Sequence, residues 1–261
     1  MTILIVAPHP DDEIWGTGGL LIQSQKNKEK VTVVYITTGA LRNENKQKEK
    51  LREEAVKKIG VLLGIKQIFL RYPERSLIEK NTAIKVKNSL EKIIKKEKPN
   101  KIFVTAYEGG HPDHDICNFI VSKIKTNAQK YEYCMYNNRF GIFKAANIAR
   151  REITKKLTRD RIWWDKSSFI KPWLGNGKRL KMSSDEIKQK NVLFYHYQLT
   201  AEKPLGQMRI NIGSFPKDLF RKFPDHDYLK KPHLIFPLNY ELAFKIRFEK
   251  LRQLFIELRN I

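Results

Sequence analysis

Two short clusters of histidine and acidic residues hold the residue types that bind metals and move protons. The first reads HPDDE at residues 9–13, and the second, about a hundred residues later, reads HPDH at residues 111–114. A hydrolytic metal needs a few neutral or anionic protein ligands, an open position for water and a nearby base that does not itself bind the metal. The two clusters therefore predict a divalent-metal site built for hydrolysis.

Three residues of these clusters are candidate metal ligands. His9, Asp12 and His114 supply two imidazoles and one carboxylate, a set that suits zinc and also tolerates Fe²⁺ or Co²⁺. Asp11 is adjacent to a ligand in the same turn, so we expect it to be the general base. It would take a proton from the water at the metal and later pass it to a leaving amine.

The other two candidate catalytic residues, His111 and Asp113, belong to the second cluster. His111 lies three residues before His114 in a loop stiffened by Pro112. A protonated His111 would stabilise the oxyanion that forms opposite the metal. We expect Asp113 to hold the His111 ring in position and to raise its pKa through the opposite charge.

Both clusters follow apolar segments that have the pattern of buried parallel strands. Strands are predicted at residues 3–8, 31–37, 67–71, 101–106 and 131–136, and helices at residues 14–26, 46–63, 82–97 and 113–126. This alternation is typical of an α/β fold with a Rossmann-like, doubly wound, mostly parallel sheet. Ligands of such sheets bind at the carboxyl ends of the strands, where both clusters are expected to lie.

After residue 137 the alternation gives way to an irregular pattern. The sequence predicts a basic helix at 145–160, a loop-like stretch at 161–180, a helix at 183–196, a proline-rich segment of little periodicity at 204–237 and an amphipathic helix at 239–259. We interpret residues 1–136 as a catalytic core that holds the metal site. Residues 137–261 would form a basic cap or lid packed on that core, so that the chain is one compact unit.

The composition indicates a folded protein of a reducing compartment. Apolar residues make up 41% and aromatic residues 11% of the chain, which argues against disorder. The two cysteines, Cys117 and Cys134, have no metal-ligand spacing and are interpreted as ordinary thiols. The sequence has no signal-peptide pattern and no apolar run of membrane length, so we expect a cytoplasmic protein without a transmembrane segment. Its oligomeric state is left open.

The net charge of +23 indicates which substrates or binding partners the protein would attract. Residues 1–136 carry 24 basic and 16 acidic side chains, whereas residues 137–261 carry 27 and 12. The excess in the second half favours an anionic substrate. We interpret most of the lysines as a solvated surface and expect no specific nucleic-acid partner. The alternative is a catalytically silent binding module whose basic second half holds nucleic acid or an anionic surface.

The paired clusters resemble the PIG-L/LmbE-like family of zinc-dependent N-deacetylases. The likeness covers roughly residues 1–136 and includes GTGG at 16–19, TTG at 37–39, REEA at 52–55 and LG at 63–64. It implies removal of an acetyl group from an N-acetylglucosamine-type conjugate. It also implies the roles argued above for the ligands, the base, His111 and Asp113.

The same resemblance indicates candidate substrate contacts. Arg52 matches a family position that contacts substrate, although it could equally be a surface helix residue. Glu74 stands where family members tend to have an aspartate after the third strand, so its sugar contact depends on a longer side chain. Glu108, next to two glycines, would line the site entrance or be simply exposed. In the second half only residues 181–199 match, loosely, a helix that often ends in Tyr-x-Ser-Gln.

Several residues have simpler interpretations beside the chemical ones. Acidic residues at a helix start often serve only as caps, and two histidines with a carboxylate also occur in non-haem iron oxygenases, though as His-x-Asp on β folds. We interpret the glycines at 16–19 as allowing close approach of helix and metal loop. His226, between two aspartates, is predicted to be a surface loop residue. The tryptophans are either a sugar-stacking platform or, as we favour, core packing of the cap: Trp163, Trp164 and Trp173.

Overall fold

The fold is built on one seven-stranded sheet. The structure is a computed structural model that describes residues 1–135, 177–205, 218–232 and 238–259. The strands are β1 (Thr2–Ala7), β2 (Lys30–Thr37), β3 (Lys66–Tyr72), β4 (Lys101–Thr105), β5 (Gln129–Tyr133), β6 (Lys178–Arg179) and β7 (Leu219–Lys222). Their order is β3-β2-β1-β4-β5-β7-β6. The first five are parallel, whereas β7 is antiparallel to β5 and β6 to β7. The predicted α/β fold class is confirmed.

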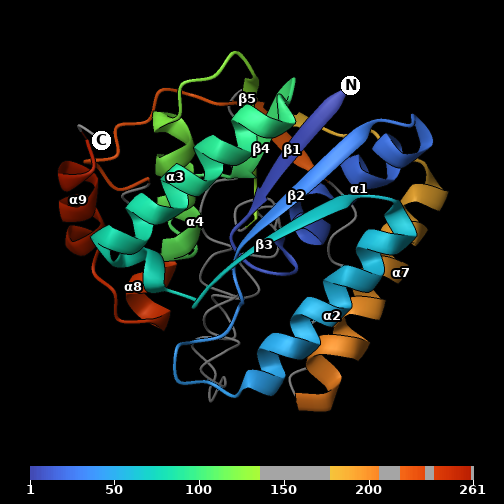
Figure 1. The fold of residues 1–261 in the computed structure, drawn as a ribbon, viewed down its shortest axis with the longest axis horizontal. Coiled ribbons are helices and arrows are strands. Elements are labelled where there is room, and N and C mark those ends of the chain that lie inside the picture. The colour runs from blue at the N-terminus through green and yellow to red at the C-terminus, as the bar shows by residue number, and fades with distance from the viewer. Residues whose placement is uncertain (136–176, 206–217, 233–237, 260–261) are drawn as a thin grey trace, which may run out of the picture.

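Helices cover both faces of the sheet (Figure 1). They are α1 (Asp12–Lys26), α2 (Lys46–Leu63), α3 (Lys80–Glu97), α4 (Pro112–Lys123), α7 (Ser184–Tyr197), α8 (Asn239–Ala243) and α9 (Phe248–Glu257), with short turns η1 (Ser76–Ile78), η3 (Gln198–Glu202) and η4 (Lys203–Leu205). Helices α1, α2 and α7 pack on one face, and α3, α4 and α9 pack on the other. None of the described helices is both long and apolar enough to cross a membrane.

Strand β1 shows why the central strands are continuously apolar. Its side chains alternate between the two faces: Leu4 and Val6 join the core under α3 and α4, whereas Ile3 and Ile5 join the core under α1 and α2. All four are fully buried. Because β1 pairs with β2 on one side and β4 on the other, the strand order changes direction here. The carboxyl ends of β1 and β4 therefore flank the point where α/β folds bind ligands.

The glycines of α1 make room for neighbouring elements. A Cβ at Gly16 would lie 2.2 Å from the ring of Tyr133 in β5, and one at Gly19 would lie 2.1 Å from Sδ of Met182. Real Cβ atoms do not approach other atoms so closely. The glycines therefore do allow another element to approach α1 closely, as predicted. The elements that approach are β5 and the segment before α7, so the prediction that the metal loop would do so is wrong.

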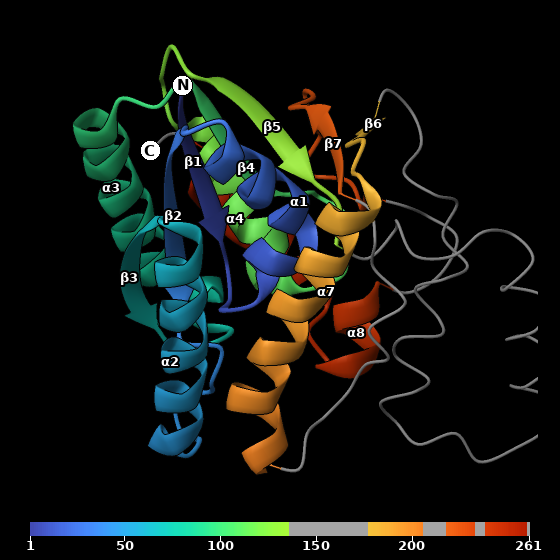
Figure 2. The same cartoon turned by 90° about the vertical axis from the view of Figure 1, so that its right-hand side faces the viewer.

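The second half of the chain extends the sheet and adds helices to both of its faces. Strands β6 and β7 were missed because they are short and lie in segments predicted to be irregular. Helix α7 packs against α1 and α2 (Figure 2), and it begins at a capping box formed by Ser183 and Glu186. The predicted final helix is two helices, α8 and α9, separated by a turn in which Lys245 has a φ of 59°. The predicted helix at 145–160 and the three tryptophans lie outside the described residues.

Buried ion pairs attach this half to the core. The Lys190 ammonium lies 2.5 Å from the Asp218 carboxylate and donates to the Trp15 carbonyl. The second Asp218 oxygen accepts the Leu20 N–H. A similar anchor involves His226, whose Nε2 lies 3.0 Å from the buried Glu132 carboxylate. His226 lies in a loop, as predicted, but its ring is largely buried and ties that loop to β5.

Candidate metal and hydrolase site

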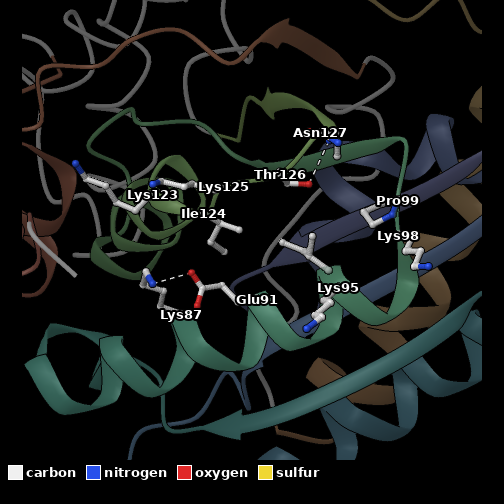
Figure 3. Close-up of a pocket in the computed structure, with 12 residues that line it drawn as sticks. Lys87, Glu91, Lys95, Lys98, Pro99, Lys123, Ile124, Lys125, Thr126 and Asn127 are labelled. Carbon is white, nitrogen blue, oxygen red and sulfur yellow. Dashed lines mark hydrogen bonds and ion pairs between the residues drawn. The ribbon is translucent and has the colours of Figure 1, made fainter.

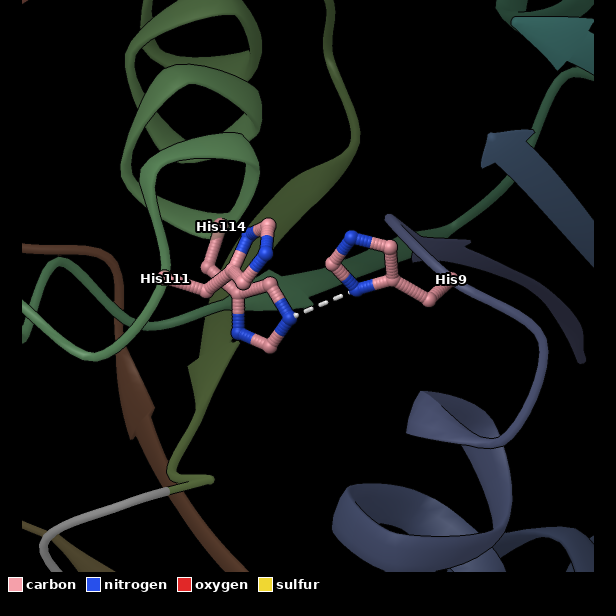
Figure 4. Close-up of side chains that lie close together, drawn as sticks. All are labelled: His9, His111 and His114. Carbon is pink, nitrogen blue, oxygen red and sulfur yellow. Dashed lines mark hydrogen bonds between the residues drawn. The ribbon is translucent and has the colours of Figure 1, made fainter. Parts of the chain in front are cut away.

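The two motifs meet at the carboxyl ends of β1 and β4. His9 follows β1 by two residues, and Asp11 and Asp12 begin α1. His111 is the N-cap of α4, with Asp113 and His114 in its first turn. Figure 4 shows the three histidine rings converging from these two elements. One ring nitrogen from each lies within 4.8 Å of the others.

Three candidate ligand atoms form a small triangle. His9 Nδ1 lies 3.1 Å from His114 Nε2 and 3.2 Å from Asp12 Oδ2, and the third side, from His114 Nε2 to Asp12 Oδ2, is 3.1 Å. Two atoms each about 2.1 Å from a tetrahedral zinc would lie about 3.4 Å apart. All three residues are at least nine-tenths buried. The donor set and its spacing thus fit a first-row divalent metal.

Asp113 supports His9 from the other side of its ring. Its Oδ2 lies 3.2 Å from His9 Nε2 and accepts the Arg75 backbone N–H at 2.7 Å. A carboxylate that accepts from one ring nitrogen leaves the other nitrogen free to bind a metal. The sequence predicted that Asp113 would hold His111. The structure corrects this, because Oδ2 is 3.9 Å from His111 Nδ1 and the carboxylate is turned toward β1.

His111 is held by the backbone of α4. Its Nδ1 accepts the Asp113 N–H at 3.1 Å, so in the neutral ring the proton is on Nε2, which faces Glu74 Oε1 at 3.4 Å. Burial, aided by the charge of His9, lowers the pKa of His111 to about 4. The predicted upward shift is therefore wrong. Near neutral pH His111 offers a neutral N–H instead of a positive charge.

Asp11 combines a strained backbone with a carboxyl group of raised pKa. Its φ of 118° lies in a region that residues with a Cβ rarely adopt, a strain of order 1–3 kcal/mol that is typical of functional sites. Its N–H donates to Glu13 Oε2. Burial and the adjacent Asp12 raise the pKa of Asp11 to about 8. Within the described part of the chain, no group hydrogen-bonds its carboxylate.

Known proteins resemble this chain most clearly over the part that carries the site. Residues 4–125 match the model of the PIG-L family, described as GlcNAc-PI de-N-acetylase. This part of the chain is thus similar to the PIG-L family. A probable N-acetyl-alpha-D-glucosaminyl L-malate deacetylase 2 of Bacillus subtilis is 30% identical over 133 residues, which are 44% of this chain and 56% of that protein. The chain thus spans little more than half the length of the curated relatives it matches.

Solved structures extend the likeness to the fold of most of the chain. The A40926 pseudoaglycone deacetylase Dbv21 superposes with a TM-score of 0.58 at 13% identity and covers 86% of this chain and 98% of its own. The zinc-inhibited form of teicoplanin deacetylase Orf2 superposes with a TM-score of 0.53 at 14% identity and covers 76% and 84%. At such low identity the agreement concerns the fold alone.

Two of the three predicted substrate contacts lie beside the site. Arg52 is buried, and its Nη2 donates to Glu202 Oε1 at 2.9 Å. It packs so closely on Gly39, where φ is 68°, that a side chain there would clash with the guanidinium. Glu74 faces His111. Although burial acts in the opposite direction, the His111 hydrogen bond and the charge of His9 lower the pKa of Glu74 below its usual range.

The third predicted contact, Glu108, has a structural role. Its side chain is 1% exposed, and Oε1 accepts the Met135 N–H at 2.7 Å while the Cys134 thiol donates to Oε2. The expectation that it lines the entrance is therefore wrong in this structure. Asp115, which sequence reasoning missed, accepts the N–H groups of Glu108 and Gly109. It fixes the loop that leads to His111, and its position in the first turn of α4 was the available signal.

The second half supplies groups that the sequence did not identify. The Tyr197 hydroxyl, at the end of α7, donates to the Pro10 carbonyl at 2.9 Å. Glu202, the partner of Arg52, lies in η3, a π-helical turn that continues α7. Such turns occur frequently at functional sites. The loose family likeness at residues 181–199 was the only sequence signal for this contact.

A separate hollow of about 900 Å³ lies at the opposite, amino ends of β4 and β5 (Figure 3). It is lined by the carboxyl-terminal turns of α3 and α4 and by the segments that follow them. Its lysines include Lys95, Lys98, Lys123 and Lys125. Lysines at helix carboxyl ends compensate the helix dipole. They thus have a structural explanation that is independent of the metal and hydrolase site.

Proposed function

We propose that this chain is a metal-dependent hydrolase that removes the acetyl group from an N-acetylated amino sugar of the N-acetylglucosamine type. The observation that carries the proposal is the triangle of His9, Asp12 and His114 atoms with Asp11 beside it. The PIG-L family and its curated relatives, which are described as deacetylases of such sugars, support the reaction class. The substrate proposed is an amino-sugar conjugate, and the basic charge of residues 137–261 favours an anionic one.

The triangle would hold zinc, with Fe²⁺ or Co²⁺ as possible substitutes. A bound zinc ion would act as a Lewis acid toward a water and the amide carbonyl. Asp113 would keep the Nε2 proton of His9 in place and so direct Nδ1 toward the triangle. Asp12 would be held in the same orientation by the His9 backbone N–H, which donates to its Oδ2 at 2.8 Å.

Asp11 would move the proton. Attack on the amide requires a base that removes a proton from the water, and departure of the amine requires an acid that returns it. A carboxyl group with a pKa raised to about 8 can do both near neutral pH, because neither protonation state is strongly disfavoured. The absence of another hydrogen-bonding partner among the described residues leaves its oxygens available for this transfer.

His111 would bind the carbonyl oxygen as negative charge develops on it. Its Nε2 proton is fixed by the hydrogen bond that Nδ1 accepts from Asp113. The contact of Nε2 with Glu74 is long at 3.4 Å, so the N–H has capacity for a second acceptor. A neutral donor of this kind contributes to oxyanion stabilisation without first having to gain a proton.

We also propose that the second half acts as a cap that completes the site. Tyr197 fixes the Pro10 carbonyl beside the metal loop, and Glu202 neutralises Arg52. Both contacts come from the end of α7 and η3. A cap attached in this way would let the basic second half influence which conjugates reach the site.

The proposal is tested by acetate release from a panel of N-acetylglucosamine conjugates after zinc loading. The panel contains the free sugar and its malate, phosphate, inositol and chitobiose forms. We expect release from at least one conjugate, loss of release in His114→Ala and a lower zinc content in that variant. No release from any conjugate by protein with bound zinc would contradict the proposal, and retention on DNA that survives His114→Ala would favour the binding module instead.

A further inference from the structure

A second arginine lies beside the site and has no assigned role. Arg75 follows Glu74 directly, in the connection between β3 and η1. Its φ of 64° is left-handed, and its N–H donates to Asp113 Oδ2 at 2.7 Å. The same Asp113 oxygen pairs with His9. The backbone of Arg75 is therefore fixed relative to the candidate metal ligands.

The side chain of Arg75 is placed by Phe244, which ends α8. The guanidinium carbon lies 4.9 Å from the centre of the Phe244 ring, and the His111 ring contacts the same phenyl ring edge-on, with 4.9 Å between ring centres. Phe244 thus contacts both groups. The two distances together keep the guanidinium within about 10 Å of the centre of the His111 ring. An amino sugar whose acetamide reaches His111 would bring its linked substituent into this region.

Other arginines near the strand ends already have carboxylate partners. Arg52 pairs with Glu202, and Arg71 pairs with Glu53 through two hydrogen bonds. In the described part of the chain Arg75 makes no ion pair and its side chain makes no hydrogen bond, and its Nε is buried without a partner. A buried donor without an acceptor is costly. The guanidinium is therefore arranged for an acceptor that is not part of the described chain.

The chemistry of the guanidinium limits what that acceptor is. Its planar set of donors matches carboxylate and phosphate groups through two parallel hydrogen bonds. Its position over the Phe244 ring holds the guanidinium without using its donors. We propose that Arg75, held over Phe244, binds an anionic group, a carboxylate or a phosphate, on the substituent linked to the amino sugar. This inference rests on the proposed function and names the part of the substrate that Arg75 selects.

The first measurement compares kcat/KM of wild type and Arg75→Gln on three conjugates of N-acetylglucosamine. The malate glycoside carries carboxylates, the 1-phosphate carries a phosphate, and the methyl glycoside is neutral. We expect the ratio of anionic to neutral kcat/KM to fall by about 10- to 100-fold, chiefly through KM, as for a lost charged hydrogen-bond pair. The conjugate with the larger fall identifies the anion. Arg75→Lys should restore part of the preference because it keeps the charge.

Arg71→Gln is the matched control, since Arg71 is an exposed arginine four residues earlier that pairs with Glu53. It should leave the ratio unchanged. Phe244→Leu should lower the ratio by removing the ring that holds the guanidinium. An equal loss on all three conjugates in Arg75→Gln would overturn the inference, because it would show a structural role without selectivity.

Binding separates this inference from the proposed function. The malate glycoside, the 1-phosphate and the methyl glycoside are titrated calorimetrically into wild type, Arg75→Gln and Arg75→Lys. Weaker binding of an anionic conjugate, but not of the methyl glycoside, in Arg75→Gln would support the anion contact even if no conjugate were hydrolysed. Unchanged binding of both anionic conjugates would refute it even if the deacetylase activity were established.

Discussion

The Asp113 carboxylate lies 3.2 Å from His9 Nε2, on the opposite side of the ring from Asp12 and His114. This contact orients a candidate metal ligand through a residue of the other motif, 104 positions away. It therefore gives the second motif a role in positioning a residue of the first. The helix that supplies His114 also supplies the group that fixes His9.

Removing that carboxylate should weaken metal binding. In Asp113→Asn we expect zinc affinity to fall by about 10- to 100-fold, as is typical when the carboxylate partner of a histidine ligand is lost. The measurement is a zinc titration against a competing chelator. Asp185→Asn, on the exposed face of α7, is the matched control and should bind zinc like wild type. Unchanged affinity in Asp113→Asn would show that His9 does not depend on this contact.

Asp11→Asn should separate metal binding from turnover. The substitution keeps the size of the side chain but removes its ability to take up a proton, so kcat should fall by about 10²- to 10⁴-fold. Zinc content, measured by elemental analysis, should stay close to that of wild type because Asp11 is outside the ligand triangle. Turnover that persists at the wild-type rate would remove Asp11 from the mechanism.

The junction between α1 and α7 should respond to acid. Glu186 accepts hydrogen bonds from Gln23, the Ser183 backbone and Lys26, and these lower its pKa to about 2 from 4.5. A depressed pKa in the folded state gives stability that is present above pH 4.5 and is lost as the pH falls toward 2. Glu186→Gln should therefore lower Tm by about 2–4 °C at pH 7 and have little effect at pH 2.

The test is a pair of thermal melts of wild type and Glu186→Gln across this pH range, followed by circular dichroism. Comparing the two proteins at each pH removes the contribution of other titrating groups. A difference in Tm that stays constant from pH 7 to pH 2 would show that the charge of Glu186 does not stabilise the fold.

The sequence was sufficient to predict the central sheet and the convergence of the two motifs. Long apolar strands such as β1 and helices such as α2 carry strong periodic patterns, and parallel topology brings the strand ends together without further information. The motif residues therefore came within reach of each other as predicted. Strand β7, with four residues in a proline-rich segment, carries no comparable pattern.

The errors concern side chains whose partners are far away in the sequence. Glu108 was expected at the entrance because it precedes two glycines, yet its acceptor role toward Met135 depends on where β5 ends. Asp113 was expected to orient the ring of its neighbour His111, whereas in the structure its carboxylate contacts the ring of His9. His226 is tied to Glu132, 94 residues away. The partner of each of these side chains depends on tertiary packing, which local sequence patterns do not predict.

The glycines of α1 give a prediction in which two local effects compete. Gly16→Ala should favour the helix by about 1 kcal/mol through backbone entropy, but its Cβ would lie 2.2 Å from the Tyr133 ring. Tyr133 is fully buried and its hydroxyl donates to the Val6 carbonyl, so the ring cannot move aside easily. The clash should therefore dominate and destabilise the protein by about 1–3 kcal/mol. Chemical denaturation measures this, with Lys58→Ala on the exposed face of α2 as control. A more stable Gly16→Ala variant would show that β5 can shift away from α1.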